Sequence, residues 1–423
     1  MNSDHSFSGL IPIAVPPVEP PMSSAAPAAP APRLPRLACR MADMPPSAVR
    51  EILKVAERPD ILSFAGGLPA PELFPVAAIA EAHADVLRDD GGKALQYSTT
   101  EGFAPLRAWI AMHLRQRGIP ARPEELLITS GSQQGIDLVS RVFLDPGDVV
   151  LVDNPTYLAA IQSFAAYQVR LVTVPSDDHG MRVDDLADLI AAHRPKLIYV
   201  VPSFQNPRGT TLPQARRAEI AEIAAHHGVA IIEDDPYGEL SFDGPPPRPI
   251  AAAGSGNVFY LGTFSKTLAP GLRIGWLWGD AGIVRKATIC KQAADLHTAT
   301  LAQRATAALL DRFDYAGHVA RICEVYRERC QTMLGALAEY LPDGSSWVAP
   351  TGGMFVWLQL PAQIDAETLF PEAIARKVAF VPGAAFFVEG HRRDFVRLNF
   401  SNQPPLSIVE GMRRLGEVVA GAL

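Results

Sequence analysis

The sequence has few cysteines and no paired histidines at metal-ligand spacing. Its four cysteines, in 423 residues, include no C-x-x-C pair, which favours free thiols in a reducing compartment over a disulfide framework or a zinc site. The ten histidines include no H-x-x-x-H or H-E-x-x-H pattern. We therefore predict no metal centre.

The sequence also lacks long apolar runs and an excess of positive charge. No stretch reaches the roughly 18 apolar residues of a membrane-spanning helix, and the N-terminus lacks the basic-then-apolar order of a signal peptide. The formal net charge of -7 offers no basic surface to nucleic acid or to an anionic membrane. We expect a cytoplasmic protein that acts on small molecules, with neither nucleic acid nor membrane as a partner.

Length and composition indicate more than one domain. A chain of 423 residues, 48% of them hydrophobic, can bury one large core and a second, smaller one. Residues 1–36 hold nine prolines and few large apolar side chains, so we predict a disordered extension there. We expect residues 37–80 to form an arm that joins the small domain and covers the active site, residues 81–315 a large domain, and residues 316–423 a small C-terminal domain.

Short apolar runs alternate with amphipathic helical stretches through the predicted large domain. The runs are ELLITS, DVVLVD, VRLVTV, KLIYVVPS, VAIIEDD, NVFYLGT and RIGWLWG. Such alternation is typical of buried, mostly parallel strands joined by crossover helices. The sequence therefore predicts an α/β fold whose large domain has a mostly parallel seven-stranded sheet flanked by helices, together with a smaller α+β domain.

Polar clusters follow the ends of five of these runs. The clusters are GSQQG, DNPTY, SFQNPRG, EDDPYGE and TFSK. Ligands of open α/β sheets bind outside the carboxyl ends of the strands. We expect the five clusters to meet at one edge of the sheet and to form a binding site.

Two of the clusters offer groups for a charged ligand. Ser132 and Gln133 stand at a predicted helix start, where a hydroxyl and backbone N–H groups could bind phosphate, although Ser132 could also simply cap the helix. Glu233, Asp234 and Asp235 follow a strand and could bind a cation or form a solvated turn. A buried carboxylate among them would need a cationic partner such as a protonated heterocyclic nitrogen.

Five further residues have both a structural and a functional interpretation. Asn206 precedes a proline and is a turn residue or a donor to a ligand oxygen, and Tyr157 and Tyr237 either pack or stack on a ring. Arg397 lies in a strand pattern and is either exposed to solvent or directed into a cleft to bind a carboxylate. Lys266 in GTFSKTLAPGLRIGW is a surface lysine or a reactive amine, and its place after an apolar run favours the second.

Taken together, these segments resemble the fold type I pyridoxal-phosphate aminotransferases of class I/II. The likeness is to the branch of 2-aminoadipate and kynurenine aminotransferases and runs from about residue 47 to the C-terminus. The matching segments, in order, are SAVREILK, SFAGGLPAPELFP, LQYSTTEG, TSGSQQGID, NPTY, FQNPRG, EDDPYGEL, TFSKTLAPGLRIG, PTGGMF, FVPGAAFF and RLNFS.

The resemblance implies catalytic roles for four residues. Lys266 would form the Schiff base with pyridoxal phosphate and move protons, and Asp234 would pair with the pyridinium nitrogen. Asn206 and Tyr237 would hydrogen-bond the phenolate oxygen of the ring. The implied reaction moves the amino group of an L-amino acid to a 2-oxo acid, expected to be 2-oxoglutarate, in a ping-pong cycle.

The resemblance also implies how the cofactor and the substrate are held. Tyr157 would stack on the ring, and Tyr97 would reach the phosphate in the neighbouring subunit of a homodimer. The remaining phosphate ligands would be Ser132, Gln133, Thr263, Ser265 and Arg273. Arg397 would grip the substrate α-carboxylate, with Asn206 and Gly67 beside the substrate and Arg50 offered to a distal carboxylate, which favours acidic or long-chain donors over aromatic or branched ones.

Two alternatives and two departures accompany this interpretation. The same lysine and aspartate would serve a lyase, a β-replacement enzyme or an oxidase. A ligand-sensing regulator is disfavoured because the first 46 residues are too few and too rich in proline and alanine for a winged helix. Arg208 stands where relatives commonly carry a small hydroxyl residue and Lys377 where glycine is frequent, and both bear on the choice of substrate.

Overall fold

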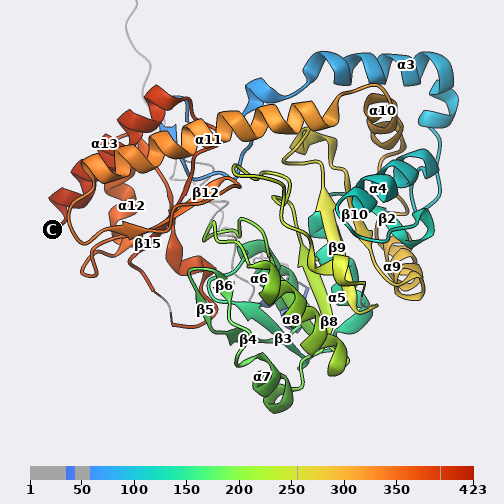
Figure 1. The fold of residues 1–423 in the computed structure, drawn as a ribbon, viewed down its shortest axis with the longest axis horizontal. Helices are drawn as coiled ribbons and strands as arrows, with labels where there is room; N and C mark the ends of the chain where they lie inside the picture. Colours follow the sequence, from blue (N-terminus) through green and yellow to red (C-terminus); the bar gives the residue numbers. More distant parts are fainter. Residues whose placement is uncertain (1–34, 43–57, 255, 391) are drawn as a thin grey trace, which may run out of the picture.

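The computed structural model describes residues 35–42, 58–254, 256–390 and 392–423. Arg50 and the predicted SAVREILK helix lie outside these ranges, as do residues 1–34 of the predicted extension. Figure 1 shows a larger α/β part and a smaller part beside it, with the long helix α11 (Tyr315–Tyr340) running along both. None of the helices in the described ranges is long and apolar enough to cross a membrane.

A seven-stranded sheet forms the centre of the larger part and confirms the predicted fold class. Its order is β2-β10-β9-β8-β7-β3-β4, and all neighbours are parallel except β10, which is antiparallel to β2 and β9. The strands are β2 (Leu126–Thr129), β3 (Val149–Asp153), β4 (Arg170–Val174), β7 (Leu197–Val200), β8 (Ala230–Asp234), β9 (Val258–Thr263) and β10 (Gly275–Trp278). Each of the seven predicted apolar runs is one of these strands.

The strands are largely apolar, as expected of a sheet with helices on both faces. Successive side chains of a strand point to opposite faces. Thus Ile232 of β8 belongs to the cluster that includes Ile136 of α5 (Ser132–Phe143), whereas Ile231 belongs to the cluster that includes Ile220 of α8 (Gln214–His226). The other helices of this part are α3 (Val76–Ala94), α4 (Ala104–Gln116), α6 (Leu158–Ala165), α7 (Leu186–His193), α9 (Ala281–Ala294) and α10 (Thr300–Leu310).

The smaller part is built on a four-stranded antiparallel sheet. Its order is β11-β12-β15-β14, from β11 (Ser346–Trp347), β12 (Phe355–Gln359), β14 (Val381–Pro382) and β15 (Phe395–Asn399), with helices α12 (Ala366–Ala375) and α13 (Pro405–Gly421). A short parallel pair joins β1 (Leu62–Ser63) to β13 (Val378–Ala379), so the segment before residue 80 packs with the C-terminal part. The domain boundaries at residues 36, 80 and 315 stay predictions.

Short elements complete the fold. They are α1 (Cys39–Ala42), the hairpin of β5 (Ser176–Asp177) with β6 (Gly180–Met181), and the 3-10 turns η1 (Pro71–Leu73), η2 (Pro123–Glu125), η3 (Ile250–Ala253), η4 (Pro270–Leu272) and η5 (Gly383–Phe386). The core cluster on the α5 face of the large sheet continues into the small sheet through Phe355 and Val396. The two parts therefore meet at the carboxyl ends of the large-sheet strands, where a site can draw residues from both.

Candidate cofactor and substrate site

A cavity of about 300 Å³ lies where the carboxyl ends of the large-sheet strands face the small sheet. The predicted site residues that line it are Gly67, Ser132, Gln133, Tyr157, Asn206, Asp234, Tyr237, Thr263, Ser265, Lys266, Arg273 and Arg397. Tyr97 does not line the cavity; the residue is 78% exposed, and its ring lies beside His297. Arg50 lies outside the described residues.

Lys266 follows β9 and is partly buried at the cavity wall. Its Nζ donates a hydrogen bond to the carbonyl of Gly67 at 2.7 Å. Burial, with repulsion from Arg397 and Arg273, lowers the pKa of Lys266 to about 8. The amine is therefore neutral in part of the population near pH 7, and the neutral amine is the nucleophile toward carbonyl groups.

Asp234 ends β8 and is buried on the cavity floor. The hydroxyl of Tyr199 donates to its Oδ2 at 2.8 Å, whereas Oδ1 has no hydrogen-bond partner within the described part of the chain. Burial raises the pKa of Asp234 to about 7, although Tyr199 opposes the shift. A buried carboxylate oxygen without a partner is a site for a cationic N–H donor.

The two acids beside Asp234 are also buried, so the solvated-turn interpretation of the cluster is wrong. Glu233 accepts hydrogen bonds from the backbone N–H groups of Ile250 and Ala251, and Asp235 lies 2.9 Å from Arg117. Successive side chains alternate between the two faces of the sheet, which explains why neighbouring acids point in opposite directions. Glu233 and Asp235 face away from the cavity and Asp234 faces into it.

Arg397 and Asn206 form one hydrogen-bonded unit at the side of the cavity. Nη1 of Arg397 donates to Oδ1 of Asn206 at 2.8 Å, and Nη2 donates to the carbonyl of Ala65 at 2.7 Å. The guanidinium lies between the rings of Phe355 and Phe386, with ring centroids at 4.5 Å and 5.1 Å. Burial lowers the pKa of Arg397 to about 10. The exposed-strand alternative is therefore wrong, and a buried cation faces the cavity.

Two tyrosines supply rings to the cavity. Burial, with a contribution from Asp234, raises the pKa of Tyr157 to about 12, and burial also raises the pKa of Tyr237. Both hydroxyls are therefore protonated at neutral pH and can donate hydrogen bonds. Tyr237 also packs edge-on against Phe355, which joins the large sheet to the small one.

A cradle suited to an anion lies at the start of α5. Gly131 precedes the helix with φ +85°, and a Cβ on it would come within 2.4 Å of Nη2 of Arg273. A Cβ on Gly275 would come within 2.7 Å of the backbone nitrogen of Ser132. Only glycine fits at positions 131 and 275, so the backbone at both positions approaches the start of α5 closely. Helix N–H groups and an exposed guanidinium that meet in this way can bind a phosphate.

The strand end opposite α5 adds hydroxyl groups to this cradle. The Thr263 hydroxyl lies 2.8 Å from that of Ser265, and it accepts the backbone N–H of Ser265 at 3.1 Å. Arg273 has left-handed backbone (φ 54°), and its Nη2 donates to the carbonyl of Ser130 at 2.8 Å. The loop before β10 thus turns the guanidinium toward the helix start.

Several contributors to the site did not stand out in the sequence. Tyr199 holds Asp234 from the middle of an apolar run, and Phe355 and Phe386 enclose Arg397 from glycine-rich segments. Strand alternation would have placed Tyr199 and Asp234 on one face had the pairing of β7 with β8 been known. No local pattern marks the carbonyls of Ala65 and Gly67 as acceptors.

Arg208 and Lys377, the two cations that depart from the family pattern, do not line this cavity. Lys377 pairs with Asp60 at 2.6 Å and is 42% exposed at its side chain. Arg208 lies on the loop of Asn206 but extends to the other side of that loop, into a separate cavity. Neither side chain therefore contacts the cavity that contains Lys266.

Comparison with known proteins gives the family. The family model described as aminotransferase class I and II matches residues 60–415. Aromatic-amino-acid aminotransferase 1 of Thermococcus litoralis is 45% identical over 89% of this chain and 92% of its own length, and 2-aminoadipate transaminase of Thermus thermophilus is 45% identical over 89% and 94%.

A solved structure extends this likeness to three dimensions. An α-aminoadipate aminotransferase from Thermus thermophilus, complexed with N-(5'-phosphopyridoxyl)-L-leucine, superposes with a TM-score of 0.86 at 43% identity over 91% of this chain and 97% of its own. The chain therefore belongs to the class I and II aminotransferases, enzymes of fold type I that transfer amino groups with pyridoxal phosphate as the cofactor.

Proposed function

We propose that this aminotransferase moves the amino group of an acidic or long-chain L-amino acid to 2-oxoglutarate in a ping-pong cycle that depends on Lys266. The observation that carries the proposal is the meeting of a partly neutral lysine, an unpartnered carboxylate and a buried arginine in one cavity. Aromatic donors are the second candidate, because one of the two relatives at 45% identity is named for them.

The residues of the cavity fit pyridoxal phosphate at both ends of the molecule. The unpartnered Oδ1 of Asp234 would accept the N–H of a protonated ring nitrogen, and the cradle of Ser132, Gln133, Thr263, Ser265 and Arg273 would hold the phosphate. When bound, the cofactor supplies an aldehyde that accepts amino groups and a ring that withdraws electrons from the substrate. Tyr157 would stack on the ring.

The residues of the chain bind the substrate and move protons. Arg397, already oriented by Asn206 and by the carbonyl of Ala65, would bind the α-carboxylate in a bidentate fashion. The Nζ of Lys266 would accept the proton from the substrate α carbon and release it again later in the half-reaction, which a pKa of about 8 favours near neutral pH. Asn206 and Tyr237 would donate hydrogen bonds to the phenolate oxygen of the ring.

A homodimer completes the proposed site. Tyr97 is exposed, and its neighbour Leu95 is 72% exposed. Leu68, which follows the cavity-lining Gly67, is 49% exposed. Exposed apolar side chains near a site favour a contact with another chain. Tyr97 would then reach the phosphate held by the partner subunit. We also propose a cytoplasmic location, in keeping with the free thiols of Cys290, Cys323 and Cys330.

A panel of amino donors tests the proposed function. The purified enzyme with pyridoxal phosphate and 2-oxoglutarate should form glutamate fastest with 2-aminoadipate and more slowly with phenylalanine or leucine. Faster transfer from phenylalanine would support the aromatic alternative. Release of ammonia or peroxide without pyridoxamine phosphate would identify a lyase or an oxidase instead. An Arg50→Ala variant with unchanged preference for acidic donors would remove the role proposed for Arg50.

A further inference from the structure

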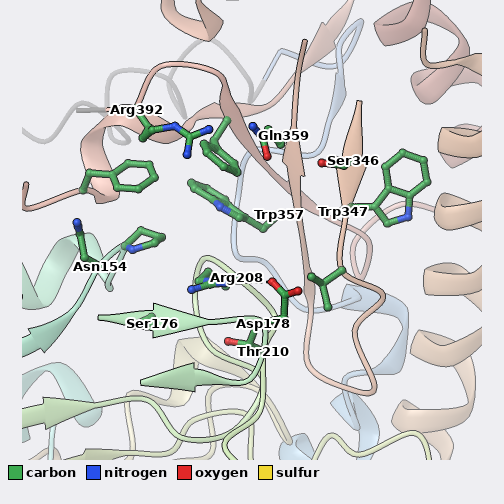
Figure 2. A pocket seen from close by; sticks show the side chains of 14 residues that line it. Asn154, Ser176, Asp178, Arg208, Thr210, Ser346, Trp347, Trp357, Gln359 and Arg392 are labelled. Carbon is green, nitrogen blue, oxygen red and sulfur yellow. Dashed lines mark ion pairs between the residues drawn. The ribbon is translucent and has the colours of Figure 1, made fainter. Parts of the chain in front are cut away.

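A second cavity, of about 420 Å³, lies between the β5–β6 hairpin of the larger part and the four-stranded sheet. Figure 2 shows Trp357 in its middle, with Arg208 and Asp178 on one side and Arg392 on the other. Its volume falls within the roughly 300–1,000 Å³ of small-molecule sites. It shares no lining residue with the cavity of Lys266.

Arg208 supplies a cation that the protein compensates only in part. Its side chain is 15% exposed, and the carboxylate paired with it, Asp178, is 3.7 Å away and 76% exposed. An ion pair so open to water contributes little. Asp153 also attracts the guanidinium, and it accepts a hydrogen bond from Ser176 at 3.0 Å. Burial lowers the pKa of Arg208, although Asp153, Asp178 and Asp177 oppose the shift.

The other arginine of the cavity is already engaged. Arg392 pairs with Asp394 at 2.6 Å and lies over the ring of Phe395, with the centroid at 4.7 Å. The guanidinium of Arg208, by contrast, makes no hydrogen bond with any described residue. The cavity therefore offers one arginine for a carboxylate, placed at one end.

Aromatic side chains form the opposite wall. Trp357 and Phe395 are stacked with centroids 5.1 Å apart and planes 10° apart, and Phe387 lies 6.0 Å from Trp357. Trp357, Phe387 and Phe395 line the cavity together with Trp347 and Val348. Flat apolar walls next to a single arginine match a ligand with a planar body and one carboxylate.

The loops that line this cavity also carry catalytic side chains on their other side. The amide of Gln205 donates to the carbonyl of Pro155 at 2.9 Å and accepts the backbone N–H of Arg208 at 2.9 Å. Arg208 follows Asn206, which holds Arg397, by two residues, and Pro155 precedes Tyr157 by two. A ligand on Arg208 would thus contact the loops that position the substrate clamp and the ring-stacking tyrosine.

We propose that this cavity is a second binding site, which takes a small aromatic carboxylate on Arg208 against the Trp357 wall. The site is separate from the one that binds substrate, so its occupant is an effector of the enzyme. Binding there and binding in the catalytic cavity are coupled through the loop of residues 205–210, and the coupling acts equally in both directions.

Calorimetry with the catalytic cavity filled tests this proposal. The enzyme is first saturated with N-(5'-phosphopyridoxyl)-L-leucine, and 2-naphthoate is then titrated as the probe. We expect one equivalent of naphthoate to bind to each chain. Naphthalene-2-carboxamide, which lacks the charge, should bind at least about tenfold more weakly, because a charge-assisted bidentate pair is lost.

Two variants separate a site on Arg208 from nonspecific adsorption. Arg208→Gln should weaken naphthoate binding at least about tenfold, whereas Asp178→Asn, which removes the competing carboxylate, should leave it equal or tighter. Saturation of Arg208→Gln with the phosphopyridoxyl conjugate shows that the variant is folded. Absence of one-to-one binding, or equal binding by Arg208→Gln, would overturn the proposal. Failure of the conjugate itself to bind would instead count against the proposed function.

Discussion

Two neighbouring regions of the molecule bury charge in opposite ways. In the catalytic cavity, Asp234 and Lys266 have no oppositely charged partner among the described residues. On the other side of the large sheet, Arg117 lies 2.9 Å from Asp235 and donates to the hydroxyl of Tyr260. One oxygen of Asp235 also lacks a hydrogen bond, but the charge of Asp235 is opposed. Burial alone therefore does not mark a functional group, and the lack of an oppositely charged partner is what separates Asp234 from its neighbour Asp235.

The paired region extends to a second contact between a buried acid and a basic side chain. His113 lies 3.2 Å from Glu239, which also accepts from the hydroxyl of Tyr315 at 3.0 Å. Burial opposes ionisation of Glu239, but His113 and Arg117 lower its pKa to about 2. Its pKa thus moves the opposite way from that of Asp234. The partners, and not the depth of burial, set the direction.

The two buried lysines show the same contrast. Lys291 is fully buried, and its Nζ donates to Asp295 at 2.8 Å and to Gln134 at 2.6 Å. Burial lowers its pKa, but Asp295 opposes the shift. Within the described ranges, Lys266 has only the carbonyl of Gly67 as an acceptor. One lysine holds α9 against α5, and the other is available for chemistry.

Replacement of Lys266, compared with replacement of Lys291, gives the largest expected effect. Lys266→Ala should reduce amino transfer at least about 10³-fold, because the nucleophile and the proton carrier are the same group. Borohydride should no longer fix the cofactor to the chain, as measured by mass spectrometry. Lys291→Gln is the matched control and should keep both the fixed cofactor and most of the activity. If borohydride still fixed the cofactor to the Lys266→Ala variant, another amine would hold the cofactor.

The next largest effect concerns the paired acid. Asp235→Asn should lower the free energy of unfolding by about 3–5 kcal/mol, because Arg117 is then buried without its partner. Denaturant titration of the cofactor-free protein measures this cost. Double replacement by Asp235→Asn and Arg117→Met should recover part of it, since both charges are removed. A single variant as stable as the wild type would show that the pair contributes nothing.

The sequence alone could not tell these two acids apart. Asp234 and Asp235 are adjacent and chemically identical, and a run of three acids after a strand is most often a solvated turn. The seven strands were predictable because buried parallel strands are continuous apolar runs. Which acid faces the cavity depends on the pairing of β8 with β7 and on Tyr199, and both are contacts between distant segments. The resemblance selected Asp234, and the structure gives the physical reason.

Replacement of the buried arginine in the cavity is a smaller change. Arg397→Lys keeps the charge but loses the planar fork that Asn206 and Ala65 orient. We expect KM for the amino donor to rise about 10- to 100-fold, with a smaller change in kcat. Steady-state kinetics with the amino donor varied at several fixed concentrations of 2-oxoglutarate measure both. The matched variant is Lys377→Arg, at a surface pair with Asp60, which should leave both constants unchanged.

The last expected effect is a pH dependence of stability that replacement of Asp234 should change. The pKa of Asp234 is raised from 3.8 to about 7 in the folded protein, so between these values the folded state binds more protons than the unfolded state. Stability contributed by this group therefore falls as pH rises from about 4 to about 7. In the cofactor-free protein, Asp234→Asn should consequently gain stability relative to the wild type over this window, with no further gain above about pH 7. Thermal unfolding at pH 5, 6, 7 and 8 measures the difference. A constant difference would mean that Asp234 finds a cationic partner in the cofactor-free protein, and the contrast between the two regions would then disappear.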